Sequence, residues 1–209
     1  MGGNAFGLRS RVDAFSDEEF EQGVAYAHAA GVNVHVPVNI LMHDSDVDKL
    51  PAYLSWLDSL GVDAIIASDL GTIRLARVHA PRVAVHLSTQ ASCSNVEAAL
   101  AYHELGVSRI VLARELSLSE IAHMRESLPD TLQLEAFVHG SMCMAISGRC
   151  LISDYLTGRG GNRGECTQPC RWGYQVVEPT RAPERFPLEQ DDLLSYLFNS
   201  RDLMMLDHL

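Results

Sequence analysis

The sequence lacks the features that several protein classes need. It has no apolar run approaching the roughly 20 residues of a membrane-spanning helix. Its opening residues, MGGNAFGLRSRVDAF, have neither the basic region nor the apolar region of a secretory signal peptide. It also lacks the HExxH motif of zinc proteases and the GxSxG motif of serine hydrolases. We therefore expect a cytoplasmic protein without a membrane span and without either hydrolase signature.

Basic residues are also scarce. The 16 basic residues are outnumbered by 27 acidic ones, which gives a formal net charge of −11, and Lys49 is the only lysine. This balance argues against a broad basic surface that coats nucleic acid without sequence preference. The exception is the stretch 139–174, where four arginines face only two acidic residues. Any binding of anions is therefore expected in this stretch.

A repeated phrase indicates the architecture. The segments AAGVNVHVPVN, SLGVDAIIAS and ELGVSRIVLAR each end an amphipathic stretch at Gly-Val and then enter a short run rich in Val and Ile. Gly31, Gly61 and Gly106 are expected to end helices in the left-handed conformation, which glycine adopts without penalty. Helix starts are marked by capping-box spacings, namely Ser16 with Glu19, Ser94 with Glu97 and Ser117 with Glu120.

The alternation of strands and helices predicts an α/β fold with a parallel sheet and helices outside it. The 209 residues are enough for one sizeable core. Five strands are expected, at about Val32–Asn39, Asp63–Ser68, Arg82–Ser88, Arg109–Arg114 and Gln133–His139. In such folds the functional site lies at the carboxyl ends of the strands. Here those ends carry polar residues, which suit either a site or ordinary loop entry.

The regular pattern stops after His139. We expect residues 140–175 to form a long, Cys-rich loop with little regular structure across the strand ends, beyond the βα repeat of residues 1–139. Residues 176–209 are expected to be an acidic, Pro-containing connection in the same domain. They should end in a helix that begins at Asn199 or Ser200.

The loop holds four cysteines within 28 residues, with the spacing Cys-x6-Cys-x15-Cys-x3-Cys. In a reducing compartment such a cluster indicates a metal site before redox or nucleophilic use, and a structural disulfide is the least expected. Structural zinc sites favour two to four residues between paired cysteines, a spacing that only Cys166 and Cys170 have. Iron–sulfur clusters accept irregular spacings, so an iron–sulfur cluster is favoured and zinc stays open. The predicted ligands are Cys143, Cys150, Cys166 and Cys170.

Other polar residues near these cysteines are candidates for binding and proton transfer. Arginines can hold a carboxylate or a phosphate in bidentate geometry, and amide side chains or Trp172 can bind a planar substrate. The substrate-binding candidates are Arg149, Arg159, Asn162, Arg163, Gln168 and Arg171. His139 could move a proton, or could act with Ser141 as base and nucleophile. Cys93 lies outside the cluster, and we expect it to be a buried filler rather than a ligand.

Together these segments resemble peptidase family U32. The likeness rests on FVHGSMCMAISGRCLISDYLTGRGGNRGECTQPCRWGYQVVE and FNSRDLMMLDHL, with VNVHVPVNI, DAIIASDLG, VHLSTQAS and IVLAREL earlier in the chain. It implies a TIM-type barrel, here incomplete, because family chains normally begin with an extra strand and helix and continue into a further strand. Two positions depart from the family pattern: Gly160-Gly161 stands where Asp-Ala is usual, and Cys93 replaces Asn or Val.

The resemblance implies one of several activities. Some family members are classed as proteases, whereas others support oxygen-independent hydroxylation of tRNA wobble uridine, of a ribosomal RNA cytidine or of the ubiquinone ring. These members use cysteine-bound iron–sulfur clusters, and those that act on RNA are linked to prephenate. The closest branch is tRNA hydroxylation, which implies a 4Fe–4S cluster on the four cysteines, transient binding of tRNA, and a carboxylate co-substrate. Peptidase activity, a cluster-binding subunit that acts only in a complex, and homo- or hetero-oligomers stay open.

Overall fold

A computed structural model describes residues 1–3, 5–8, 14–177, 179–181, 184–187 and 203–204. Its centre is a five-stranded sheet in the order β1-β2-β3-β4-β5, with every neighbouring pair parallel. All five predicted strands are present and the predicted α/β class is confirmed. The strands are β1 (His35–Val38), β2 (Ala64–Ala67), β3 (Ala84–Leu87), β4 (Val107–Val111) and β5 (Gln133–Glu135).

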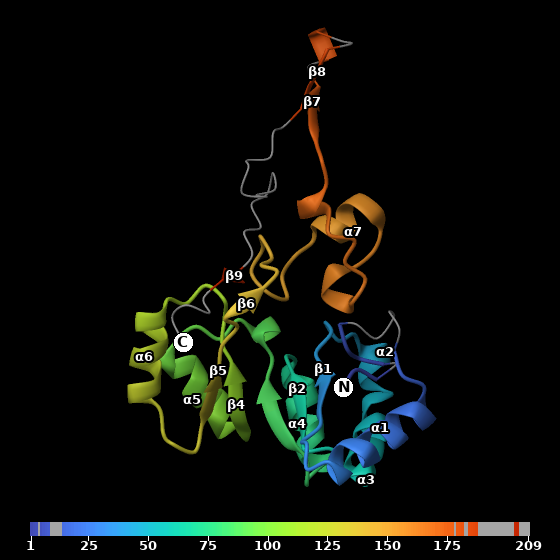
Figure 1. The fold of residues 1–209 in the computed structure, drawn as a ribbon, viewed down its shortest axis with the longest axis vertical. Coiled ribbons are helices and arrows are strands. Elements are labelled where there is room, and N and C mark those ends of the chain that lie inside the picture. The colour runs from blue at the N-terminus through green and yellow to red at the C-terminus, as the bar shows by residue number, and fades with distance from the viewer. Residues whose placement is uncertain (4, 9–13, 178, 182–183, 188–202, 205–209) are drawn as a thin grey trace.

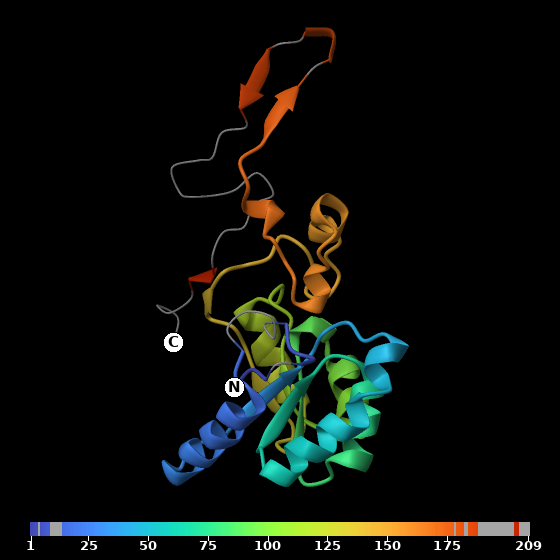
Figure 2. The ribbon, with the colours of Figure 1, turned by 90° about the vertical axis from the view of Figure 1, so that its right-hand side faces the viewer.

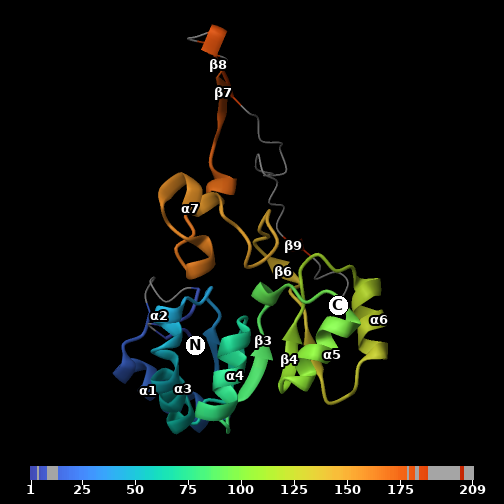
Figure 3. The same ribbon diagram turned by 180° about the vertical axis from the view of Figure 1, so that it is seen from behind.

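Helices connect each strand to the next, so the chain advances by one position in the sheet with every βα unit (Figure 1). This is the arrangement of consecutive strands in a TIM-type barrel. The helices of the described part are α1 (Asp17–Ala29), α2 (Asp44–Val47), α3 (Leu50–Leu60), α4 (Leu70–His79), α5 (Val96–Glu104), α6 (Leu118–Ser127) and α7 (Ile152–Thr157). Helix α5 packs against β4, and α3 packs against α4 (Figure 3). None of them is long and apolar enough to cross a bilayer.

The local signals act largely as predicted. Ser16 with Glu19 and Ser117 with Glu120 form complete capping boxes. Gly31, Gly61 and Gly106 have φ of +70°, +71° and +92°, the left-handed values expected after a helix.

The third predicted cap was wrong by one residue. The cap of α5 is Asn95, whose side chain accepts a hydrogen bond from Ala98 N, and not Ser94. Asparagine caps a helix as well as serine does, so the residue nearer the first turn takes the position.

The two faces of the sheet differ in character. One face packs its Val, Ile and Leu side chains against the helices, and Val36, Ile65, Leu87 and Ile110 are all buried in that core. Residues that alternate with these core positions are more polar. The rings of His35 and His86 meet edge to face at 4.8 Å, and Arg109 donates to Gln133 Oε1 at 2.6 and 2.9 Å.

The amino-terminal residues border the free side of β1. The amino group of Met1 donates to His35 O, and Phe6 O accepts the amides of Asn39 and Ile40. The segment therefore runs along β1 in the same direction, and it satisfies backbone groups that an exposed strand edge would leave unpaired.

Several predicted boundaries were wrong. Strand β4 begins at Val107 rather than Arg109, and β5 ends at Glu135 rather than His139. His139 lies instead in β6 (His139–Gly140), which pairs antiparallel with β9 (Leu203–Met204). The predicted carboxyl-terminal helix is therefore wrong at Leu203 and Met204, while its predicted caps, Asn199 and Ser200, lie outside the described residues. The ends of a strand depend on the partner strand with which it pairs. Because that partner is distant in sequence, local strand propensity does not predict these ends.

The buried histidine makes the fold sensitive to acid. Burial lowers the pKa of His86 to about 4, with smaller contributions from Arg109 and His35. Unfolded histidine binds a proton near pH 6.5, so the native state should lose stability as the pH falls from about 6.5 to 4, on the order of 2 kcal/mol. Urea unfolding at pH 7.5, 5.5 and 4 measures this loss. His86→Gln should show a smaller loss over the same interval, and an equal loss in both proteins would contradict the assignment.

Candidate metal centre at the carboxyl ends of the strands

The four clustered cysteines lie in one segment above the carboxyl ends of the strands (Figure 1). We call residues 141–174 the cysteine lobe. It contains α7 and two single turns of 3₁₀ helix, η2 (Gly161–Arg163) and η3 (Pro169–Arg171). The prediction of little regular structure was therefore right for most of the lobe but missed α7. Beyond the lobe, β7 (Gln175–Val177) and β8 (Arg185–Pro187) form an antiparallel hairpin that points away from the sheet (Figure 2).

On the side of β1 the lobe is held by hydrogen bonds and an ion pair. Leu41 N donates to Asn162 O at 2.8 Å, and Arg163 Nη1 donates to Leu41 O at 2.7 Å. The same guanidinium pairs with Asp46, with Nη1 and Oδ2 2.7 Å apart. This hydrogen bond from Arg163 lowers the pKa of Asp46 to about 2. Asp46 is therefore ionised at neutral pH, and the ion pair fixes η2 above the end of β1.

On the side of β3 and β4 a second set of contacts holds the start of the lobe. Ser92 Oγ donates to Ser147 O at 2.8 Å, and the guanidinium of Arg114 donates to Ser147 Oγ. Ser147 is itself buried, at 4% exposure. Next to it, Gly148 has φ of +78° and lies directly on the carbonyl oxygen of Gln90. A backbone this close to its neighbour leaves no space for a side chain.

The four lobe cysteines are free thiols, and Cys93 is a fifth, which is buried as predicted. Cys143 and Cys166 are exposed, whereas Cys150 and Cys170 are half-buried. Burial raises the pKa of Cys166, and the nearby charges of Cys143, Cys150 and Cys170 raise it further. Cys166 therefore lies near the other three thiols of the lobe. Deprotonated thiols that lie near one another repel, and a bound cation offsets this repulsion.

The arrangement of the side chains and the chemistry of the donors are separate tests of a metal site. Among the described residues, no three Cys, His, Asp or Glu side chains are grouped as ligands of one metal ion. The donor set suits a soft metal or an iron–sulfur cluster, because it consists of four free thiols within one lobe.

A small polar cavity lies beneath the lobe. Its volume is about 90 Å³, and it is enclosed by the ends of β1 and β2, the turn after β3, and the lobe. Its lining residues are Asn39, Ile40, Leu41, Ser68, Asp69, Gln90, Gly148 and Asn162. Two of these residues bond to each other, since Ser68 Oγ donates to Asn39 O at 3.1 Å. The side chain of Asn39 also donates to Ser88 Oγ, which does not line the cavity, at 3.1 Å. The residues at the strand ends therefore form the side of the cavity that lies opposite the lobe.

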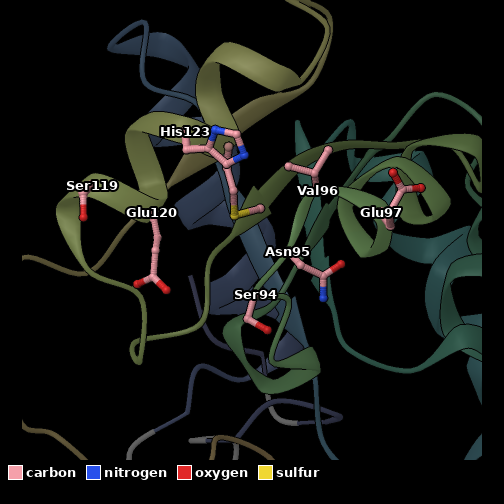
Figure 4. A pocket seen from close by; sticks show the side chains of 8 residues that line it. Ser94, Asn95, Val96, Glu97, Ser119, Glu120 and His123 are labelled. Carbon is pink, nitrogen blue, oxygen red and sulfur yellow. The ribbon is translucent and has the colours of Figure 1, made fainter.

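A larger hollow of about 500 Å³ lies elsewhere, between the first turns of α5 and α6 (Figure 4). None of the four lobe cysteines lines it, and the carboxylate of Glu120 on its wall is engaged in capping Ser117. We therefore place the candidate site at the lobe and not in this hollow.

The predicted binding residues divide into two groups. Asn162 and Arg163 are engaged within the protein, with Cys150, Leu41 and Asp46 as their partners. Arg149, Arg159 and Gln168 are exposed. Gln168 is left-handed at φ +55°, and its amide donates to Cys166 Sγ at 3.3 Å.

The remaining candidates lie at the two ends of the lobe. Arg171 contacts Met142 O at 3.5 Å, and Trp172 Nε1 donates to Thr167 O. His139 is exposed on β6, and in the described part no hydrogen bond joins it to Ser141.

The structure also reveals residues that the sequence did not single out. Asp46 and Ser147 have no motif, and each acts through a partner more than 30 positions away, Asp46 through Arg163 and Ser147 through Arg114. The only sequence feature that pointed to them was the excess of arginine in the lobe, because arginines require anionic or polar partners.

A βα repeat that carries a four-cysteine lobe at its strand ends defines the class of this protein. The chain belongs to peptidase family U32, which it matches over residues 1–209. Among solved structures, it is similar to the U32 peptidase Mk0906, with a TM-score of 0.54, 20% identity, and coverage of 64% of this chain and 57% of that one. This likeness supports the α/β fold.

Particular relatives are more similar in sequence. The chain is 39% identical to tRNA hydroxylation protein P1 of Bacillus subtilis (strain 168), over 100% of this chain and 49% of that protein. It is 42% identical to tRNA hydroxylation protein P of Escherichia coli (strain K12), over 83% of this chain and 38% of the relative. The 23S rRNA 5-hydroxycytidine C2501 synthase of E. coli is 37% identical, over 85% of this chain and 26% of that enzyme. The chain thus spans about half the length, or less, of these curated relatives.

Two glycines of the lobe provide a matched test of how it docks. Gly148 and Gly158 both have positive φ, but only at Gly148 would a Cβ strike a neighbour, the carbonyl of Gln90. Both alanine variants carry the left-handed strain of about 1–2 kcal/mol. Gly148→Ala should lose a further 1–3 kcal/mol or so from steric overlap, measured as the free energy of unfolding in urea. Equal losses in the two variants would contradict the close docking of the lobe on β3.

Proposed function

We propose that this chain takes part in the hydroxylation of a pyrimidine in RNA, with a tRNA uridine as the substrate. The observation that carries the proposal is the match to two proteins named for tRNA hydroxylation, at 39% identity over 100% of this chain and 42% identity over 83% of it. A third relative is named for making 5-hydroxycytidine, a hydroxylated pyrimidine, in 23S rRNA. RNA hydroxylation is thus what these relatives have in common.

We further propose that Cys143, Cys150, Cys166 and Cys170 hold an iron–sulfur cluster of the 4Fe–4S type. Support comes from the irregular spacing of the four cysteines and from their presence as free thiols in one lobe. When bound, such a cluster supplies electron transfer or Lewis acidity, which suits a hydroxylation that does not use O2. Zinc, the alternative cofactor, would supply Lewis acidity alone.

The residues around the cysteines have separate tasks in this proposal. Arg149 and Arg159 are exposed on the lobe and can bind RNA phosphate, or the carboxylate of a co-substrate such as prephenate. Gln168 and Arg171 flank Cys170 and can orient the substrate. His139, exposed at the base of the lobe, can carry a proton. Arg163 instead keeps the lobe in place through Asp46.

A peptidase reading has less support. The older family name and the Methanocaldococcus jannaschii relative called an uncharacterized protease, 37% identical over 97% of this chain, favour it. Covalent peptide hydrolysis, however, needs a nucleophile within reach of a base. His139 and Ser141 share no hydrogen bond in the part of the chain that the structure describes.

Metal analysis tests the cluster. After anaerobic purification we expect brown protein that contains iron and acid-labile sulfide. Alanine at Cys143, Cys150, Cys166 or Cys170 should lower the iron content at least fivefold, whereas Cys93→Ala should retain it because Cys93 is buried outside the lobe. Colourless, iron-free native protein, or unchanged iron in all four variants, would refute the cluster.

Hydroxylation is tested separately in a bacterium that lacks its own U32 tRNA-hydroxylation gene. Nucleosides from its tRNA are measured by mass spectrometry with and without this chain. We expect hydroxylated uridine to reappear, and to be lost with Cys150→Ala. Cleavage of casein by the same protein without any change in tRNA would support the peptidase reading instead.

A further inference from the structure

Asn162 makes an unusual pair of contacts with one cysteine. Its Oδ1 accepts a hydrogen bond from Cys150 N at 3.2 Å, and its Nδ2 donates to Cys150 O at 2.9 Å. A carboxamide has one acceptor and one donor group side by side, and here both are used on the backbone of a single residue. Asn162 therefore fixes the peptide groups on either side of the Cys150 Cα, and with them the direction in which the thiol leaves the chain.

This contact is anchored to the sheet. The backbone oxygen of Asn162 accepts the amide of Leu41, and the adjacent Arg163 is paired with Asp46. Leu41 lies in the loop after β1 and Asp46 lies in α2, so the position of Cys150 depends on the segment between β1 and α3 as well as on the lobe. A connected set of hydrogen bonds thus runs from β1 through η2 to Cys150.

The same turn contacts the other half of the cysteine set. Gly161 lies so close to Cys166 that a Cβ added at Gly161 would be 3.5 Å from Cys166 Cβ and 3.7 Å from Cys166 Sγ. The turn η2 therefore touches Cys150, from the first pair of cysteines, and Cys166, from the second. A carboxamide is essential only for the first of these contacts.

We propose that Asn162 is a positioning residue that aligns Cys150 with Cys166, and that it is not a substrate-binding residue. The inference rests on the proposed function insofar as the two thiols are ligands. The hydrogen bonds themselves join only groups of the chain. They can therefore be tested independently of the cluster.

Amide hydrogen exchange on metal-free, reduced protein, read at single-residue resolution, tests the contact. In Asn162→Ala the amide of Cys150 loses its acceptor, so its exchange rate should rise at least tenfold. The amide of Leu41 should change less than twofold, because it donates to the backbone oxygen that alanine retains. Tyr155→Ala is the matched control in the same lobe, since that side chain is 87% exposed, and it should change neither amide.

Two results would overturn the proposal. Unchanged exchange at Cys150 in Asn162→Ala would mean that the carboxamide does not hold this residue. Equal acceleration at Cys150 and Leu41 would mean that the substitution releases the whole turn, so that the side chain has only a general structural role.

A second measurement connects the contact to the ligands. Iron loss to an excess of chelator under anaerobic conditions should be at least fivefold faster in Asn162→Ala than in the native protein or Tyr155→Ala, and the visible spectrum of the remaining cluster should shift. Loss at the native rate with an unchanged spectrum would overturn the positioning role. Native protein without iron would refute the cluster instead, while the exchange experiment would still decide whether Asn162 holds Cys150.

Discussion

The docking of η2 onto the end of β1 is the contact on which the rest of the candidate site depends. The ion pair of Arg163 with Asp46, and the backbone bond from Leu41 to Asn162, join a segment of few regular elements to the loop and helix that follow β1. A loop of this length gains precision only from such contacts, because its own backbone supplies few hydrogen bonds. The location of the thiols is thus set by the sheet.

The arginines in and near the lobe have two different surroundings. The protein is acidic overall, yet its lobe is rich in arginine. Arg163 is neutralised by Asp46 and the strand-end residue Arg114 donates to Ser147, whereas Arg149 and Arg159 remain exposed. One part of the local positive charge therefore holds the lobe on the sheet, and another part is available to anionic ligands. Arginine suits both uses because its planar guanidinium can make several directed hydrogen bonds at once.

Much of the fold could be predicted from the sequence because its signals are local. The left-handed glycines after α1, α3 and α5, two of the three capping boxes and all five parallel strands follow from short patterns. The four cysteines were equally clear, and their concentration in one lobe was expected from their spacing. What failed was decided at long range: β6 pairs with β9, and the sequence near Leu203 reads as a helix.

The same limit applies to the site. Asn162 and Arg163 were predicted to bind substrate, and that stays a prediction; their hydrogen bonds to Cys150 and Asp46 could not be predicted from the sequence. An amide or a guanidinium in a Gly-rich loop has the same appearance in sequence whether it binds a ligand or a distant backbone group. Asp46 was not recognised at all, because an acidic residue after a strand has many ordinary roles.

We propose that the four lobe cysteines jointly hold one iron–sulfur cluster above the strand ends. X-ray absorption at the iron edge of the anaerobically purified protein tests it most directly. The account predicts a first shell made only of sulfur, together with iron–iron scattering from neighbouring atoms of one cluster. Zinc in place of iron, or isolated iron with nitrogen and oxygen ligands and no iron neighbour, would contradict it.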